Sequence, residues 1–179
     1  MINQPKRKNV LLVGTSNCKF LNAKFIAGRG KYVHKEIKYT VKDATEYVVK
    51  CDIDKPDVVV YQVTCNDVDS SENTTTVDKL DVLVKETQNK FGHDTNIILS
   101  LPLPRENKLV NDKARKLSGS IVNHFSHYNN VTCSDNSNLT YRSQPLEGIL
   151  NKDGKHLSKW GTNLLAQKIK EELYEMFSV

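Results

Sequence analysis

Short apolar runs alternate with longer amphipathic segments along the whole chain. Five segments have the apolar or alternating composition of strands: 9–13, 32–39, 57–64, 95–101 and 131–133. Five others carry apolar residues at helical spacing: 17–27, 40–51, 74–91, 110–128 and 157–177. Because strands alternate with helices, the pattern predicts an α/β fold with a parallel sheet of about five strands and helices on both faces.

Two stretches show neither period and are expected to be loops. Residues 65–73 are polar and follow a buried strand, and residues 134–152 are rich in Asn, Ser and Thr. Loops of the latter length in compact domains are often functional. Since no internal repeat or second domain is evident, we expect a basic N-terminal tail at 1–8 followed by a single domain at 9–179.

The composition is that of a soluble globular protein with a substantial core. Of the 179 residues, 38% are hydrophobic and 26% are charged. No apolar run reaches the roughly 20 residues that a membrane-spanning helix needs. The N-terminus is polar and basic and lacks the apolar stretch of a signal peptide, so we expect an intracellular protein, cytoplasmic or nuclear, or a part of a larger multidomain one. The four cysteines have no paired spacing, which favours reduced thiols.

Three residues with the chemistry of a serine hydrolase lie at the two ends of the chain. Ser16 follows the first predicted strand and begins a helix, whose N–H groups and dipole favour a nucleophile. Asp153 and His156 precede the last helix, and their spacing of three lets the carboxylate reach the imidazole within one loop. A serine hydroxyl needs a base, and the base needs a partner that fixes its tautomer. Because a parallel sheet gathers the loops at the carboxyl ends of its strands, we predict a catalytic triad.

Asn66 follows the third predicted strand and is expected at the same edge of the sheet. Its side-chain amide can donate a hydrogen bond to an oxyanion. Each of the four residues also has a purely structural interpretation. Ser16 can cap a helix, and Asn66 can bind its own backbone. His156 can be a surface residue, and Asp153 can belong to a turn. The presence of all four together favours the catalytic interpretation.

Three short blocks of this sequence resemble the SGNH (GDSL-like) hydrolase family. The blocks are Gly14-Thr15-Ser16, Asn66-Asp67 and Asp153-Gly154-Lys155-His156-Leu157. They correspond to the first, third and fifth blocks of the family, in its order and spacing, and together they span nearly the whole chain. The family fold is a flavodoxin-like three-layer α/β sandwich, which agrees with the order of elements predicted above. Residues 98–105 and 111–112 are also similar to esterase domains in the first-reading-frame proteins of some LINE-type retrotransposons.

The resemblance implies a serine esterase that needs no cofactor and no metal. By position in the blocks, Ser16 would be the nucleophile and one oxyanion donor, His156 the base and Asp153 its orienting partner. Asn66 would be the second oxyanion donor. We expect the substrate to be a small, acetyl-type carboxylic ester that is hydrolysed through an acyl-enzyme.

The chain departs from the family pattern at three places. Thr15 stands where an acidic residue is usual, and Thr64 stands where the third block usually has a glycine. The glycine of the second block is missing, since residues 31–91 contain none. The loss of its conformational freedom would weaken or reshape the oxyanion hole. The alternative function is therefore a catalytically weakened module that binds RNA, lipid or protein.

Three residues are candidates for contact with the substrate: Tyr39, Thr40 and Arg105. A backbone N–H near Tyr39 or Thr40 could take the place of the missing glycine, because any residue other than proline supplies one. Arg105 follows the fourth predicted strand, at the end of the sheet where the active site is expected. It is either a substrate contact or a surface cation.

The remaining candidates concern charge and metal binding. The formal net charge of +5 permits a nucleic-acid partner without requiring one. The run of Lys6, Arg7 and Lys8 could give weak nucleic-acid binding, although such runs are usually solvated. His124 and His127 lie three residues apart on a predicted helix. No further His or Cys completes a set of ligands with them, so no metal is expected.

Overall fold

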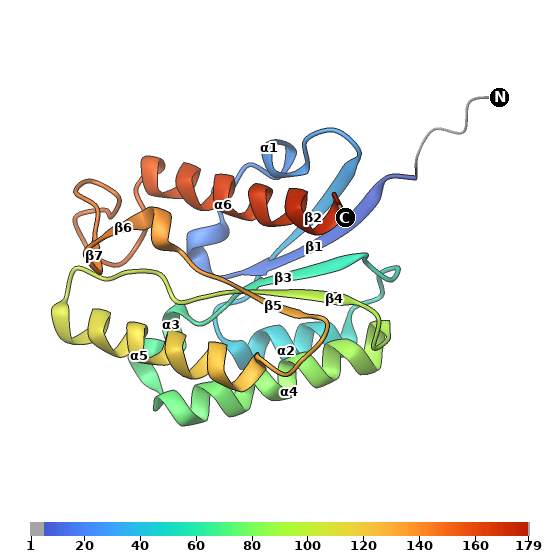
Figure 1. The fold of residues 1–179 in the computed structure, drawn as a ribbon, viewed down its shortest axis with the longest axis horizontal. Coiled ribbons are helices and arrows are strands. Elements are labelled where there is room, and N and C mark those ends of the chain that lie inside the picture. The colour runs from blue at the N-terminus through green and yellow to red at the C-terminus, as the bar shows by residue number, and fades with distance from the viewer. Residues whose placement is uncertain (1–5, 179) are drawn as a thin grey trace.

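The computed structural model describes residues 6–178 and contains one five-stranded sheet (Figure 1). The strands are β1 (Lys8–Gly14), β2 (Lys31–Ile37), β3 (Val58–Gln62), β4 (Asn96–Ser100) and β5 (Val131–Ser134). All neighbouring strands are parallel, and their order across the sheet is β2-β1-β3-β4-β5. This is the flavodoxin-like order, so the predicted fold class is confirmed.

Helices connect the strands and follow the last of them. They are α1 (Ala23–Ala27), α2 (Val41–Lys50), α3 (Cys65–Ser70), α4 (Asn73–Phe91), α5 (Lys108–Phe125) and α6 (Lys159–Phe177). Two short 3-10 helices are η1 (Ser16–Cys18) and η2 (Ser137–Leu139), and a small antiparallel hairpin is formed by β6 (Thr140–Tyr141) and β7 (Gln144–Pro145).

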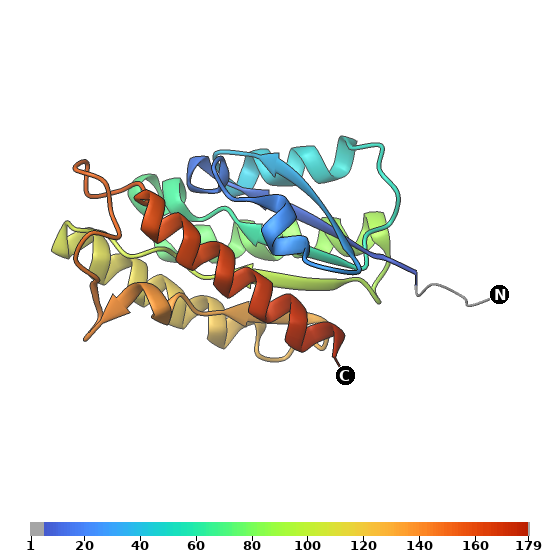
Figure 2. The ribbon, with the colours of Figure 1, turned by 90° about the horizontal axis from the view of Figure 1, so that it is seen from above.

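Helical layers cover both faces of the sheet, as Figures 1 and 2 show. Helices α2, α4 and α5 pack side by side on one face, and α1 and α6 lie together on the other. Successive residues of β1 enter different cores: Leu11 and Val13 pack toward α2 and α4, whereas Val10 and Leu12 pack toward α6. Because strands of a parallel sheet are covered on both faces, their sequences are continuously apolar, which is why the strands were predictable.

Three helices that begin near the carboxyl edge of the sheet have side-chain caps. Thr40 caps α2, Asn107 caps α5 and Ser158 caps α6, each by accepting a hydrogen bond from a backbone N–H in the first turn. These caps fix where each loop ends and each helix starts. Each of these loops is therefore anchored at the residue that begins the following helix.

Three of the predicted elements differ in the structure. The helix expected at 17–27 is divided into η1 and α1, because Asn22 starts a new helix by accepting a hydrogen bond from the N–H of Phe25 at 3.0 Å. The loop expected at 65–73 contains α3, a helix of six residues that is too short to show a helical period in the sequence. The long loop at 134–152 has the predicted position but contains η2 and the hairpin.

The first strand begins inside the segment predicted as the basic tail. Lys8 is already the first residue of β1, and its Nζ lies 3.5 Å from the carboxylate of Asp57. Residues 1–5 of the tail lie outside the described residues. No helix within residues 6–178 combines the length and the apolar character needed to cross a membrane.

Candidate active site

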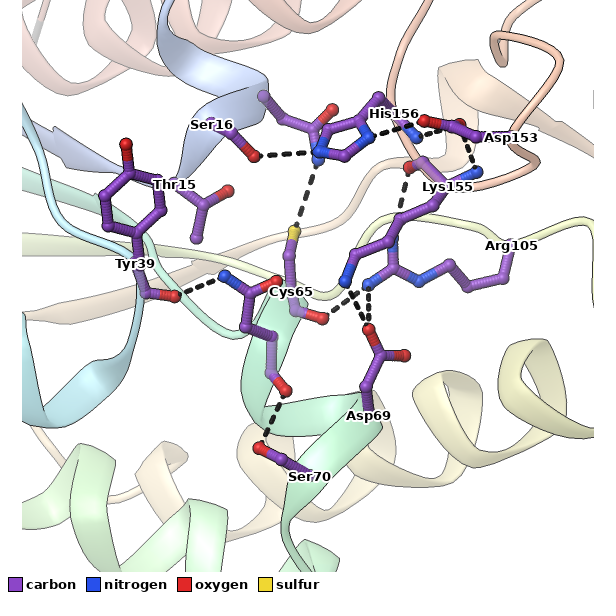
Figure 3. A network of polar contacts seen from close by, with 12 residues as sticks. Thr15, Ser16, Tyr39, Cys65, Asp69, Ser70, Arg105, Asp153, Lys155 and His156 are labelled. Atoms are coloured by element: carbon purple, nitrogen blue, oxygen red, sulfur yellow. Dashed lines mark hydrogen bonds and ion pairs between the residues drawn. The ribbon is translucent and has the colours of Figure 1, made fainter.

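Ser16, His156 and Asp153 form one continuous chain of hydrogen bonds (Figure 3). The Oγ of Ser16 lies 3.0 Å from Nε2 of His156. The other ring nitrogen, Nδ1, lies 2.7 Å from a carboxylate oxygen of Asp153. The structure thus brings together the three side chains from the two ends of the sequence, in the order hydroxyl, imidazole, carboxylate that a serine hydrolase uses.

The loop of residues 151–157, named here the triad loop, holds Asp153 through its own backbone. The second oxygen of Asp153 accepts hydrogen bonds from the N–H groups of His156 and Lys155, both at 2.9 Å. These two backbone bonds, together with the bond to the imidazole, lower the pKa of Asp153 to about 2. The carboxylate is therefore ionised at neutral pH and can only accept hydrogen bonds.

The charge on Asp153 determines which ring nitrogen of His156 carries the proton. An ionised carboxylate requires a donor, so Nδ1 must be protonated. In the neutral imidazole, the lone pair of Nε2 then faces the hydroxyl of Ser16. This is the tautomer that a general base needs in order to accept the proton of the serine.

Gly154 allows the sharp turn of the triad loop. Its φ is +65°, in the left-handed region that other residues rarely adopt. A β-carbon at this position would also lie 2.4 Å from the carboxylate of Glu106. The glycine after Asp153, in the block at 153–157, is thus needed for the backbone conformation of the loop.

Ser16 begins η1, with only Thr15 between it and the end of β1. The turn requires Gly14, because a β-carbon there would lie 2.2 Å from the Sγ of the buried Cys18. Thr15, at the position where the family usually has an acidic residue, is fully buried, and its Oγ1 lies 3.4 Å from Oε1 of the buried Gln62. A carboxylate would be costly in this environment, so the departure at Thr15 agrees with its surroundings.

Asn17 is a site residue that the sequence did not indicate. Its side chain is buried, and Oδ1 accepts a hydrogen bond from the N–H of Leu157 at 2.8 Å. Its Nδ2 lies 3.8 Å from the Sγ of Cys65 at the start of α3. Asn17 therefore joins the nucleophile turn both to the triad loop and to the helix that carries Asn66.

Asn66 lies in the first turn of α3, one residue after Cys65. Its Nδ2 donates a hydrogen bond to the carbonyl oxygen of Tyr39 at 2.8 Å. A side-chain amide has two N–H groups, so a second remains for a substrate oxygen. The contact between Cys65 and Asn17 places the start of this helix beside the turn of Ser16.

The interpretation of Thr40 as an oxyanion donor needs correction. The N–H of Thr40 donates to the carboxylate of Asp43, and its Oγ1 accepts from the N–H of Asp43, both at 3.1 Å. This reciprocal pair is a capping box. The N–H of Thr40 is already used in this pair. The carbonyl group of Tyr39 accepts a hydrogen bond from Asn66, and this contact leaves the N–H of Tyr39 uninvolved.

Arg105 is neither a surface cation nor an open substrate contact. Its side chain is 3% exposed. Nη1 donates to the carbonyl oxygen of Lys155 at 3.1 Å, and Nη2 donates to the carbonyl oxygen of Cys65. Because Nε is buried as well, the expectation for Arg105 is corrected: its guanidinium links the triad loop to the first residue of α3, as Figure 3 shows.

The other candidates lie outside this site. Nε2 of His124 lies 3.0 Å from the carboxylate of Asp81, between α4 and α5. Among residues 6–178, no group of three His, Cys, Asp or Glu side chains is arranged to hold a metal ion. The four cysteines are free thiols, and burial raises the pKa of Cys18.

Neither a family model nor a curated protein matches this sequence. Solved structures do match the fold. A Streptococcus pneumonia protein described as a platelet activating factor superposes with a TM-score of 0.80 at 19% identity, over 97% of this chain and 87% of that one. A lipase/acylhydrolase from Enterococcus faecalis gives a TM-score of 0.75 at 19% identity, over 94% and 96% of the two chains.

A third similar structure is a GDSL-like lipase from Bacteroides thetaiotaomicron, with a TM-score of 0.74 at 17% identity, over 95% of this chain and 89% of that one. At these identities the likeness concerns the fold. The superpositions cover nearly the full length of each chain, so the whole sheet and both helical layers correspond. The protein therefore has the α/β fold of these GDSL-like lipases and acylhydrolases.

Proposed function

We propose that the protein is a serine esterase that hydrolyses a small, acetyl-type carboxylic ester through an acyl-enzyme. The observation that carries the proposal is the hydrogen-bonded chain from Ser16 Oγ to His156 to Asp153, with distances of 3.0 Å and 2.7 Å. A hydroxyl, an imidazole and an ionised carboxylate in this order activate a serine for attack on a carbonyl carbon.

In the first half of the reaction, Ser16 Oγ forms a bond to the carbonyl carbon of the ester, and its proton moves to Nε2 of His156. The carbonyl oxygen becomes an oxyanion. When the tetrahedral intermediate collapses, the bond to the alcohol oxygen breaks, and Nε2 returns the proton to that oxygen. The alcohol leaves, and the acyl group remains on Ser16. Asp153 stays ionised throughout and stabilises the transient imidazolium.

In the second half, water takes the place of the alcohol. His156 Nε2 accepts a proton from the water as its oxygen attacks the acyl carbon. The collapse of the second intermediate breaks the bond to Ser16 Oγ, which regains its proton from Nε2. The products are the carboxylic acid and the free enzyme, so no cofactor or metal is needed for balance.

Two groups form the proposed oxyanion hole. The backbone N–H of Ser16 lies at the start of η1, where the first N–H groups have no acceptor within the helix. The second N–H of the Asn66 side chain is the other donor. The carbonyl of Tyr39 accepts a hydrogen bond from the first N–H of this amide, so the plane of the Asn66 amide is oriented before the substrate binds. Such preorganisation favours catalysis.

The exposure of the site supports a small acyl group. The side chains of His156 and Asp153 are 40% and 50% exposed, so the reacting face is open to solvent. A long acyl chain would gain binding free energy from a deep apolar channel. An acetyl group does not need one, and the alcohol part can be large. One structure of the same fold, with a TM-score of 0.74 at 12% identity over 94% and 97% of the two chains, is an acetyl esterase variant with an acetate ion.

A colorimetric ester assay tests the proposal. Wild-type protein should hydrolyse p-nitrophenyl acetate faster than p-nitrophenyl esters of long fatty acids. The Ser16→Ala variant should lose this activity. Ser120→Ala, on the exposed face of α5, is the matched control and should keep it. An unchanged rate in Ser16→Ala would reject the esterase function.

The alternative is a module of this fold that binds RNA, lipid or protein in a retrotransposon-type protein. It is favoured by one observation, the capping box that removes the N–H of Thr40 from the oxyanion hole. The similarity of residues 98–105 to retrotransposon esterase domains is compatible with either function. RNA binding that persists at physiological salt, in a protein without esterase activity, would support the module, because non-specific binding through a few phosphates is lost as salt rises.

A further inference from the structure

Arg105 lies between β4 and α5 and is buried at the edge of the candidate active site. Pro102 and Pro104 keep the backbone before it extended. Its own N–H donates to Oδ1 of the buried Asn111 at 3.0 Å, so the direction in which the side chain leaves the loop is fixed. Arginine is almost never fully buried without partners, and the partners of Arg105 are specific.

Arg105 and Glu106 donate hydrogen bonds to two consecutive peptide units of the triad loop. Nη1 of Arg105 donates to the carbonyl of Lys155 at 3.1 Å, and the N–H of Glu106 donates to the carbonyl of Gly154 at 3.0 Å. The N–H groups of the same two peptide units point the other way, to Asp153, at 2.9 Å each. Each peptide plane is therefore held on both sides, and its N–H is directed at the carboxylate that orients His156.

The other end of the guanidinium reaches α3. Nη2 donates to the carbonyl of Cys65 and lies 3.5 Å from the carboxylate of Asp69. The Nζ of Lys155 lies 2.6 Å from the same oxygen of Asp69, so Asp69 is shared between the two cations (Figure 3). The guanidinium thus joins the triad loop to the helix that carries Asn66, the candidate oxyanion donor.

We propose that Arg105 is a positioning residue for the reaction. It orients the peptide unit between Lys155 and His156 so that Asp153 holds the imidazole, and it fixes the triad loop relative to Asn66. It acts through these groups and does not contact the substrate, because its terminal nitrogens are bonded and Nε is buried. The kinetic consequence rests on the proposed esterase function, whereas the effect on the imidazole rests on the contacts alone.

Two variants test the role. Arg105→Lys keeps the charge, but a single ammonium cannot bridge the carbonyls of Cys65 and Lys155 as a planar guanidinium does. Arg105→Gln removes the charge. Both should lower kcat for p-nitrophenyl acetate by about 10- to 100-fold with KM changed less than about threefold, because small misplacements of catalytic groups act mainly on the transition state.

Arg115 supplies the matched control. Its side chain is 56% exposed and lies 3.6 Å from Asp112, so Arg115→Lys and Arg115→Gln make the same chemical changes at a surface site. They should leave kcat and KM as in the wild type. If Arg105→Gln does not fold, Arg105→Ala with added guanidinium ion replaces it, and kcat should then rise with the guanidinium concentration.

Nuclear magnetic resonance gives a readout that does not depend on activity. A ring N–H that donates to an ionised carboxylate has a far-downfield resonance, and Nδ1 of His156 is such a group. This resonance should be present in the wild type and in the Arg115 variants, and broadened or lost in folded Arg105 variants. If Arg105 only stabilised the fold, its substitution would lower the melting temperature and leave the Nδ1–H resonance of His156 unchanged.

The outcomes separate the two proposals. Loss of kcat together with the resonance in folded Arg105 variants supports the positioning role. A normal kcat and a normal resonance in these variants overturn it, and so does a rise in KM alone, which would make Arg105 a substrate contact. A wild-type protein without esterase activity contradicts the proposed function, whereas a resonance lost only in the Arg105 variants would still support the positioning role.

Discussion

The side-chain oxygen of Asn17 accepts a hydrogen bond from the N–H of Leu157 at 2.8 Å, across 140 residues of sequence. Asn17 directly follows Ser16, and Leu157 directly follows His156. The bond therefore joins the covalent neighbours of the two residues that share the 3.0 Å contact between hydroxyl and imidazole. Because the bond is buried, the side chain of Asn17 holds the nucleophile turn to the backbone of the triad loop, at the distance that proton transfer requires.

The first prediction concerns this bond. Asn17→Ala removes the acceptor and leaves the buried N–H of Leu157 without a partner, which should cost about 1–3 kcal/mol of stability. The esterase kcat should fall by roughly 10- to 100-fold, because the relation between Ser16 and His156 is loosened. Chemical denaturation and ester hydrolysis measure the two effects. Asn123→Ala, at an exposed position of α5, is the control, and an Asn17→Ala enzyme at the wild-type rate would show that the bond is irrelevant to catalysis.

The second prediction concerns the oxyanion donor. Removal of one donor typically costs about 10²- to 10³-fold in kcat, so Asn66→Ala should have an effect of that size with little change in KM. Steady-state kinetics with p-nitrophenyl acetate measure it. Asn73→Ala makes the same substitution at the start of α4, where Nδ2 binds the carbonyl of Lys113, and should leave kcat unchanged. A loss of less than threefold in Asn66→Ala would argue that other groups hold the oxyanion.

The third prediction concerns the pH dependence of activity. Backbone N–H groups and the imidazole lower the pKa of Asp153 to about 2, so its carboxylate stays ionised at every pH above about 4. We therefore expect loss of kcat/KM on acidification to come from protonation of the base, an imidazole, and not from protonation of Asp153. A profile from pH 4 to 9 should show this acid limb. Activity that stays constant down to pH 4 would exclude histidine as the base.

The hydrogen-bonded arrangement of Ser16, His156 and Asp153 was predictable from the sequence for a geometric reason. Ser16 follows a continuously apolar strand, and a parallel sheet places the loops after its strands at one edge. Asp153 and His156 lie in one turn, so their pairing is local. The same reasoning placed Asn66 after β3. Contacts made within one turn, or dictated by the sheet, can thus be inferred without a structure.

The links between loops were not predictable. Asn17 and Leu157 are 140 residues apart, and Arg105 bonds to carbonyls 40 and 50 residues away. Their partners are backbone groups, which every residue carries, so no side-chain motif marks them. The prediction of an oxyanion donor at Thr40 was wrong because the N–H of Thr40 donates to Asp43 in the capping box of α2. The one local signal was Asp43, three residues after Thr40, which is typical of a helix start.

The fourth prediction concerns acid stability far from the site. Partial burial raises the pKa of Asp81, but hydrogen bonds from His124, Lys85 and Tyr128 outweigh it and lower this pKa to about 2. A carboxylate with a depressed pKa stabilises the fold above its ordinary value near about 4, and this contribution is lost as the pH falls toward 2. Asp81→Asn should therefore lower the free energy of unfolding by about 1–2 kcal/mol at pH 7 and by much less at pH 2. Urea unfolding at the two pH values measures the difference, and an equal loss at both would contradict the ionic explanation.

The proposed reaction depends most on Ser16 as a nucleophile that His156 activates. The most direct test is reaction with a fluorophosphonate probe, followed by intact-mass measurement and mapping of the adduct by peptide sequencing. We predict one adduct per chain, on Ser16, that is absent in Ser16→Ala, strongly slowed in His156→Ala and unchanged in Ser120→Ala. A wild-type protein that stays unlabelled, or that carries the adduct on another residue, would contradict the role of Ser16 as the nucleophile.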